Sequence, residues 1–259
     1  MAEDSGGHRI QIEDAGPGVR VITFDRPEVR NAFDTAMYRE VTAALRGADA
    51  DDAVGAVVLT GRGGAFTSGQ DLAEMAAIAA GTAVEGAGQG FIGLLDCLTE
   101  FSVPLLAAVN GVAVGLGFTL LAHCDMVLVA ADARLRVPFA ELGVPAEAAS
   151  SLLFPATMGW QQAARILLTS DWVSADELVS LGFALRSCDP GAVLDETVEL
   201  AARVASHPRG ATRAITSLMR AARRDAVLEA NRREQGAFAR LLGPAAQQGA
   251  LADFAPGSA

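Results

Sequence analysis

The chain is predicted to be an α/β protein that ends in a purely helical region. Short apolar, often β-branched runs typical of buried strands alternate with segments of helical spacing as far as about Leu185. From Ala192 the strand-like runs stop, and Arg, Ala and Glu at helical spacing continue through Leu242. Asp189-Pro190-Gly191 separates the two regions. We therefore predict a core over residues 1–190 and a C-terminal helical region over residues 191–259.

The first elements are predicted to be a β-hairpin and a helix. Ile10–Glu13 and Val19–Phe24 are apolar or alternating segments on either side of Gly16-Pro17-Gly18, a sequence typical of a turn. Asp34 is a suitable N-cap, so a helix is expected from about residue 35 to residue 46.

Strands and helices are expected to alternate through the middle of the chain. Buried or short strands are predicted at Val54–Thr60, Leu105–Val109, Met126–Ala130 and Arg134–Val137. Helices are predicted at Asp71–Ala80, Phe91–Phe101 and Gly115–His123, and the Gly-rich segment Gly81–Gly90 is predicted to be a mobile loop.

Composition narrows the class of protein. The 259 residues are 51% hydrophobic, yet no stretch of about 18 residues is apolar enough to predict a membrane span. The apolar excess therefore indicates surface that is buried between subunits. The start of the chain does not resemble a signal peptide, and three widely spaced cysteines are typical of reduced thiols, so we expect a cytoplasmic protein.

Several chemistries are disfavoured by the sequence. A net charge of −11 argues against nucleic acid as a partner. All cationic side chains except histidine are arginines, which excludes lysine Schiff-base catalysis. The sequence contains no Cys-x-x-Cys or His-rich cluster, so no metal is expected. It contains no Gly-x-Ser-x-Gly or P-loop motif, and no Gly-x-Gly-x-x-Gly motif follows a predicted strand. His8, His123 and His207 lie outside any motif and are expected to be structural.

Two Gly-rich segments are the main functional signal. Ala65–Leu72 and Asn110–Gly117 each follow an apolar strand and lead into a helix. Backbone N–H groups at such a junction have no intrahelical acceptor. Two junctions that face one another would form a cradle for a developing negative charge on oxygen.

This pair of segments resembles two signatures of the crotonase (enoyl-CoA hydratase/isomerase) superfamily, F-x-x-G-x-D-L and A-x-x-N-G-x-A-x-G-x-G. The resemblance covers nearly all of the chain, from Phe24-Asp25-Arg26-Pro27 onward. It implies a spiral of ββα turns, followed by helices that make trimer contacts in a homotrimer or a dimer of trimers. It also implies an acyl-CoA thioester substrate, with coenzyme A as part of the substrate rather than a separate cofactor. The thioester oxygen would accept hydrogen bonds from the N–H groups of Gln70 and Leu116.

The general base is predicted to be Glu147. The family's hydratases use two glutamates, and the matching positions here are Thr119 and Phe139. Residues 138–151 instead resemble P-F-x-x-L-G-x-x-P-E-x-x-S-S of the Δ3,Δ2-enoyl-CoA isomerase branch, whose single catalytic glutamate falls at Glu147. The proline lies at 145 rather than 146, which leaves Ala146 before the glutamate.

The surroundings of Glu147 are expected to make it a better base. The apolar run Ala148–Phe154 would surround the carboxyl group, and burial raises a carboxyl pKa toward neutrality. A helix-start glutamate favoured by the helix dipole is the structural alternative for Glu147. Glu141 is the rival carboxylate and is expected to be solvated.

The resemblance also implies a set of substrate-binding and CoA-binding residues. Because the overall charge is negative, arginines must form a local positive patch to bind an anionic CoA thioester. Arg62 is a candidate for this patch in addition to the set of residues that the resemblance implies. The set is Arg26, Arg30, Ala65, Phe66, Ser68, Asp71, Leu72, Gly115, Phe139 and Leu142. Family members often end in Phe followed by a basic tail, whereas Phe254 is followed by no cation here and is expected to give apolar cover at most.

Three functions remain open from the sequence. The first is isomerisation of a 3-enoyl-CoA to a 2-enoyl-CoA by Glu147 through an enolate. The second is hydration of an enoyl-CoA or another crotonase reaction. The third is a non-catalytic acyl-CoA-binding scaffold, which would not need a buried carboxylate facing the ligand.

Overall fold

The computed structural model describes residues 8–79, 82 and 89–241. The expectations for the start of the chain, for most of Gly81–Gly90 and for Phe254 lie outside these residues.

The strands form two sheets. The larger sheet has the order β1-β2-β3-β5-β7-β10, and the smaller has the order β4-β6-β8-β9. All neighbours are parallel except β1 with β2 and β8 with β9. The strands are β1 (Ile10–Asp14), β2 (Val19–Phe24), β3 (Ala56–Gly61), β4 (Ala65–Thr67), β5 (Leu105–Val109), β6 (Val112–Val114), β7 (Met126–Ala130), β8 (Arg134–Arg136), β9 (Val173–Ser174) and β10 (Arg186–Cys188).

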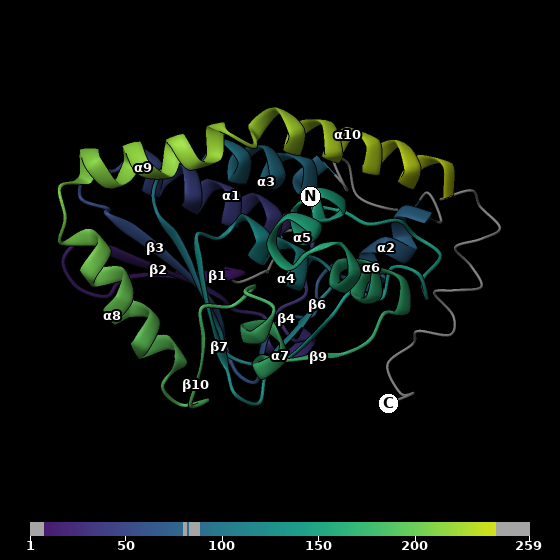
Figure 1. Ribbon diagram of the computed structural model, residues 1–259, viewed down its shortest axis with the longest axis horizontal. Helices are drawn as coiled ribbons and strands as arrows, with labels where there is room; N and C mark the ends of the chain where they lie inside the picture. Colours follow the sequence, from purple (N-terminus) through teal and green to yellow (C-terminus); the bar gives the residue numbers. More distant parts are fainter. Residues whose placement is uncertain (1–7, 80–81, 83–88, 242–259) are drawn as a thin grey trace, which may run out of the picture.

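Consecutive strands are divided between the two sheets. The strands β3, β5 and β7 lie in the larger sheet, and the strand that follows each of them, β4, β6 or β8, lies in the smaller sheet. Each pair is followed by helix, so the chain winds as a spiral of ββα turns (Figure 1). The expected fold class is thereby confirmed.

The helices cover the sheets and form an outer edge. They are α1 (Thr35–Ala50), α2 (Leu72–Ala79), α3 (Gln89–Glu100), α4 (Leu116–Thr119), α5 (Ser150–Met158), α6 (Trp160–Thr169), α7 (Ala175–Ser180), α8 (Val193–Ala205), α9 (Arg209–Ala221) and α10 (Arg224–Leu241), with short 3-10 helices at Pro27–Val29 and Leu120–His123. Figure 1 shows α9 and α10 running end to end along the top of the molecule, and α10 contacts both α3 and α5. Among the described residues, no helix combines the length and apolarity that crossing a membrane requires.

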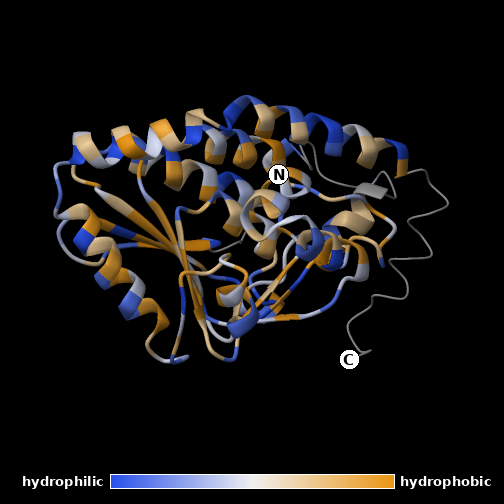
Figure 2. Ribbon diagram, in the orientation of Figure 1, coloured by the Kyte–Doolittle hydropathy of each residue, from blue (hydrophilic) through white to orange (hydrophobic). Residues whose placement is uncertain are grey.

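The division of the chain at residue 190 stays a prediction, but α8 is closely tied to the core. This helix directly follows the predicted boundary and packs against β2, β3 and β5 of the larger sheet. The strand β3 is buried along its whole length. Figure 2 shows the same difference between buried and outer elements in the hydropathy of the residues. The central strands are largely hydrophobic, whereas α10 is largely hydrophilic.

The predicted helices Asp71–Ala80 and Phe91–Phe101 differ from α2 and α3 by one or two residues at each end, and two others differ more. The Asp34 side chain accepts a hydrogen bond from the Met37 N–H at 2.8 Å and caps α1 as predicted, but the helix continues past Arg46 to Ala50. Gly47 weakens a helix only modestly, and the buried Leu45 and Ala48 supply packing that offsets this loss. The helix predicted over 115–123 is instead α4 followed by a 3-10 helix.

Candidate active site

The two Gly-rich segments meet at backbone distance. Gly69 has a φ of +86°, and a Cβ atom placed there would lie 2.5 Å from the Val114 carbonyl oxygen and 3.4 Å from the Leu116 nitrogen. An L side chain at this position would therefore be strained in its backbone and would collide with β6. Glycine at 69 thus allows the junction after β4 to touch the junction after β6.

Two backbone N–H groups at this contact have no acceptor in the described part of the chain. The neighbours of Gln70 are engaged, because the Phe33 N–H donates to the Gly69 oxygen at 2.7 Å and the Asp71 N–H donates to the Phe33 oxygen at 2.9 Å. The N–H of Gln70 itself has no acceptor among the described residues. Leu116 is the first residue of α4, so its N–H has no partner within the helix. Two N–H groups without acceptors among the described residues therefore lie at adjoining positions, and their role as donors to an oxyanion stays a prediction.

Glu147 reaches the same place from another part of the chain. A Cβ atom placed on Gly115 would lie 4.0 Å from Glu147 Oε1 and 4.0 Å from Phe139 Cε1. The carboxyl group is therefore next to the residue that precedes Leu116, and the ring of Phe139 approaches the same residue. Ala146 in place of proline does not keep Glu147 away from the two donors.

The turn that carries Glu147 has an unusual backbone. Ala148 and Ala149 have φ values of 55° and 56°, so two consecutive alanines adopt the left-handed region. Helix α5 begins at the next residue, and the Ser150 N–H donates to the Glu147 oxygen at 3.0 Å. Glu147 therefore precedes the helix by three residues and is held on a strained turn rather than within a first helical turn.

Two side chains far away in sequence hold this turn. The Nε2–H of His123 donates to the Ala148 oxygen at 2.9 Å. Burial lowers the pKa of His123 to about 4, so its ring is neutral. On α10, the Glu234 carboxylate accepts hydrogen bonds from the N–H of Ala149 at 2.7 Å and the N–H of Ser151 at 3.0 Å.

The electrostatic environment prepares Glu147 to act as a base. Burial raises its pKa to about 8, and the nearby negative charge of Glu234 contributes in the same direction. A carboxyl group with this pKa accepts a proton readily near neutral pH. The predicted rise in the pKa of Glu147 is confirmed.

A chain of hydrogen bonds fixes the side chain of Gln70. The Tyr38 hydroxyl donates to Gln70 Oε1 at 2.6 Å, and Gln70 Nε2 donates to Glu74 Oε2 at 3.2 Å. The other oxygen of Glu74 accepts the Thr35 N–H at 3.0 Å, at the start of α1. Burial, then the negative charges of Glu147 and Glu74, raises the pKa of Tyr38. Tyr38 is thus electrostatically close to the carboxylate at the site.

Neither Thr119 and Phe139, at the positions of the two hydratase glutamates, nor Glu141 is placed to replace Glu147 as the base. Thr119 is fully buried, and its hydroxyl lies 3.4 Å from the Leu116 oxygen of its own helix. Phe139 is also buried. Glu141 is exposed and forms an ion pair with Arg136 at 2.6 Å, as expected for a solvated carboxylate.

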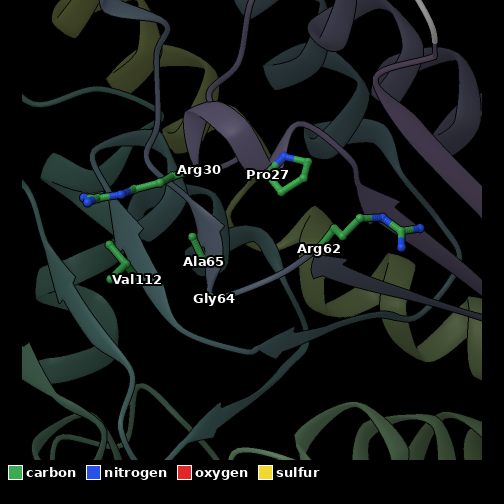
Figure 3. Close-up of a pocket in the computed structure, with 6 residues that line it drawn as sticks. All are labelled: Pro27, Arg30, Arg62, Gly64, Ala65 and Val112. Carbon is green, nitrogen blue, oxygen red and sulfur yellow. The ribbon is translucent and has the colours of Figure 1, made fainter.

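A basic pocket lies where β4 and β6 begin. It has a volume of about 410 Å³, and Ala65 and Val112, which are paired across the two strands, lie side by side in its wall (Figure 3). The residues that line it are Pro27, Arg30, Arg62, Gly64, Ala65 and Val112. Arg30 is exposed and has no ion-pair partner among the described residues. Arg62 pairs with Asp25 at 2.5 Å.

Arg26 is placed differently from Arg30. Its guanidinium is only 13% exposed and forms ion pairs with Asp71 at 3.1 Å and Asp34 at 3.4 Å. It also donates to the Ala32 oxygen at 2.6 Å. The structure therefore brings Arg30 to the pocket, while Arg26 ties the start of α1 to the residue before α2.

The remaining expected binding residues divide between the pocket wall and the supporting core. Phe66 is fully buried, and its ring centroid lies 5.2 Å from that of Phe24, so it packs behind the pocket. Ser68 is tied to the 3-10 helix near Arg30, because its hydroxyl donates to the Val29 oxygen at 3.1 Å. Leu72 is partly exposed at the start of α2, and Leu142 is half-buried in the loop between Phe139 and Glu147.

Sequence reasoning missed the residues that support the site. Glu234, Tyr38 and Glu74 belong to no motif, and His123 was expected only to be structural. A glutamate on a helix that otherwise reads as a surface helix gives no sign that it is buried. The contact between residues 149 and 234 forms only when α10 packs on α5.

Comparisons with known proteins identify the family of the chain. The model of the enoyl-CoA hydratase/isomerase family matches residues 14–255. Enoyl-CoA delta isomerase 2 of Rattus norvegicus is 38% identical over 184 residues, which cover 70% of this chain and 46% of that protein, so the chain spans about half the length of this relative. A probable enoyl-CoA hydratase of Rhizobium meliloti is 34% identical over 188 residues, which cover 73% of this chain and 72% of that protein.

A solved structure extends the similarity to the whole fold. The crystal structure of an enoyl-CoA hydratase/isomerase from Pseudoalteromonas atlantica has a TM-score of 0.89 at 32% identity, and the match covers 97% of this chain and all of that one. The names of these relatives include both isomerases and hydratases, so they agree on the family rather than on one reaction. The chain belongs to the enoyl-CoA hydratase/isomerase family of the crotonase superfamily.

Proposed function

We propose that this protein is an enoyl-CoA isomerase that moves the double bond of a 3-enoyl-CoA to the conjugated 2 position. Glu147 carries both proton transfers, and the N–H groups of Gln70 and Leu116 stabilise the intermediate. The observation that carries the proposal is the position of Glu147, whose Oε1 would lie 4.0 Å from a Cβ atom placed on Gly115, beside the two unpaired donors.

Glu147 alone can carry out both proton transfers of the proposed reaction. The Glu147 carboxylate removes a proton from C2, and the electrons move onto the thioester oxygen to form a dienolate. The two N–H groups would donate to that oxygen, and one such donor contributes about 2.7–4 kcal/mol of transition-state stabilisation in other enzymes. The protonated Glu147 then returns the proton to C4, the C2–C3 double bond forms, and the carboxylate is regenerated.

The basic pocket fits the other end of the substrate. Arg30, which is exposed and has no ion-pair partner among the described residues, provides positive charge beside β4 and β6, whereas Arg62 in the same wall is paired with Asp25. Phosphates of the coenzyme A portion would be neutralised there despite the overall charge of −11.

Hydration is the second candidate, because a probable enoyl-CoA hydratase is among the relatives. Adding water needs a group that orients and activates it. Thr119 does not ionise near neutral pH, and Phe139 has no polar atom, so the two hydratase positions supply no such group. A non-catalytic scaffold is less well supported, because a carboxyl group with a raised pKa destabilises the fold at neutral pH without serving simple binding.

The test compares Glu147→Gln with Glu141→Gln as a matched control. The substrate is a 3-enoyl-CoA, and the conjugated product is followed by its ultraviolet absorbance. Glu147→Gln should lower kcat by about 10²–10⁴-fold, the usual effect of removing a general base, while CoA-ester affinity stays near that of the wild type. Glu141→Gln should be nearly as active as the wild type.

The same preparations distinguish the alternatives. Wild-type turnover by Glu147→Gln would reject Glu147 as the base. Rapid hydration of a 2-enoyl-CoA by the wild-type protein would favour a hydratase with an unforeseen second acid, for which Glu141 would be tested first. Tight CoA-ester binding without either reaction would support the scaffold.

A further inference from the structure

Helix α5 receives its N-terminal cap from a different element. Its own N-cap residue is Ala149, which has no side-chain acceptor. The first N–H groups of a helix need acceptors outside the helix. Glu234 of α10 provides them, with Oε2 accepting from Ala149 at 2.7 Å and Oε1 accepting from Ser151 at 3.0 Å. The carboxylate is itself only 7% exposed.

The capped segment is the turn that carries Glu147. Two consecutive alanines in the left-handed region are strained, and such a backbone persists only where its surroundings hold it. His123 donates a hydrogen bond to the Ala148 oxygen, and Glu234 accepts a hydrogen bond from the N–H of Ala149. The orientation of the Glu147 side chain therefore depends on hydrogen bonds from two distant elements.

The charges around this turn are few. Glu147 and Glu234 are both acidic, and Arg233 on α10 is the cation that acts on Glu234. Tyr38 of α1 faces Glu147, and His123 is neutral and faces the turn from the 3-10 helix. Glu147 therefore has a negative neighbour across the turn and no cation identified as acting on it among the described residues.

We propose that Glu234 is a positioning residue, whose bidentate cap on Ala149 and Ser151 fixes the turn that presents Glu147 to the substrate and whose negative charge tunes that base. This rests on the proposed role of Glu147. It makes α10 part of the catalytic apparatus although Glu234 lies 85 residues from Ala149 and touches no reacting atom.

The two roles of Glu234 are separated by two substitutions. Glu234→Gln removes the charge but keeps one amide oxygen as an acceptor, whereas Glu234→Ala removes both the charge and the cap. Glu229→Gln is the matched control on the same helix, because Glu229 is half-exposed and its ion pairs among the described residues are with Arg232 and Arg233. Circular dichroism and Tm establish that each variant is folded.

The kinetic readout is the split between kcat and KM. Loss of a cap that positions a catalytic group should lower kcat of Glu234→Ala by about 10–100-fold, since small misplacements of a reacting group have effects of this size. KM should stay within about twofold, because no substrate contact is removed. A kcat of Glu234→Ala within about twofold of the wild type would overturn the positioning role.

The second readout is the pH dependence. The base must be ionised, so kcat/KM of the wild type should rise with pH through the pKa of Glu147, at about 8. Removing the negative charge of Glu234 makes ionisation of Glu147 easier, so the rise should move to lower pH in Glu234→Gln and not in Glu229→Gln. If Glu234 only stabilised the fold, Glu234→Gln would lower Tm but would not move the rise of kcat/KM to lower pH.

A measurement independent of activity separates failure of this inference from failure of the proposed reaction. The carboxyl carbons of ¹³C-labelled glutamate are titrated by NMR, and the Glu147 signal is assigned as the one missing in Glu147→Gln. A lower Glu147 pKa in Glu234→Gln supports the inference even if isomerisation is not the reaction. An unchanged Glu147 titration overturns the tuning role, and Glu234→Gln decides this even if Glu234→Ala fails to fold.

Discussion

Individual arginines have sharply different roles although the sequence presents them as equivalent. Arg26 and Arg30 lie four residues apart and were both expected to contact coenzyme A. Arg26 is nearly buried and engaged with Asp34 and Asp71, whereas Arg30 is exposed in the wall of the basic pocket. The burial of the guanidinium, and not its position in the motif, decides which one is available to a phosphate.

Arg30 is the residue at which the proposed docking of coenzyme A is tested. Arg30→Ala should raise KM several-fold at low salt with little change in kcat, because it removes a binding contact distant from the reacting carbons. The effect should shrink as salt increases, since exposed charge pairs are screened. Arg39→Ala is the control, an exposed arginine on α1 away from the pocket. Equal KM values for Arg30→Ala and the wild type at low salt would contradict this docking.

Short elements account for most of the differences between predicted and observed secondary structure. The strands β9 and β10 have two and three residues and were not foreseen, because runs of this length show no periodicity. The strand β5 has the predicted bounds, and α1 begins at the predicted residue but ends at Ala50 rather than at Arg46. The left-handed turn before α5 was also not foreseen, since alanine has no preference for that conformation.

The turn before α5 predicts a pH-dependent stability difference for Glu147→Gln. The unfolded carboxyl ionises above about 4.5, whereas the folded one keeps its proton until about pH 8. Folding therefore favours the protonated form, and this contribution to wild-type stability is lost as pH rises from 4.5 to 8. Glutamine does not ionise, so the stability of Glu147→Gln has no such pH dependence. The Tm of Glu147→Gln minus the Tm of the wild type should therefore be larger at pH 8 than at pH 5.

Thermal melts at the two pH values measure this difference. Glu141→Gln should show no comparable trend, because Glu141 is exposed. A Tm difference for Glu147→Gln that is the same at pH 5 and pH 8 would mean that the pKa of Glu147 is not raised.

The whole molecule leaves apolar side chains on its surface. On α9, Ile215, Leu218 and Met219 are 59%, 73% and 62% exposed and share one face by their spacing. On α6, Trp160 and Leu168 are 73% and 74% exposed. The expectation of apolar surface in the C-terminal region is therefore met for α9 in the single chain, and the expectation of subunit contacts there stays a prediction.

We predict a homotrimer, or a dimer of trimers, that covers the apolar face of α9. Light scattering at micromolar concentration should give three or six times the chain mass, and Leu218→Glu should shift the population toward smaller species because it buries a charge in the contact. Asp225→Arg is a control for a charge change at an exposed position on α10. A stable, active monomer would contradict the predicted assembly.

The sequence by itself determined the strands and helices of the first part of the chain and the two Gly-rich junctions, and its resemblance to the isomerase branch singled out Glu147 as the candidate base. The elements and junctions depend on local patterns: apolar periodicity, a capping aspartate, and glycines where strand turns into helix. The division of consecutive strands between two sheets, the burial of Arg26, and the support of the Glu147 turn by His123 and Glu234 were decided only by the tertiary structure. The physical reason is that burial and hydrogen-bond partnership depend on which distant elements pack together, and neither hydropathy nor spacing along the chain records that contact.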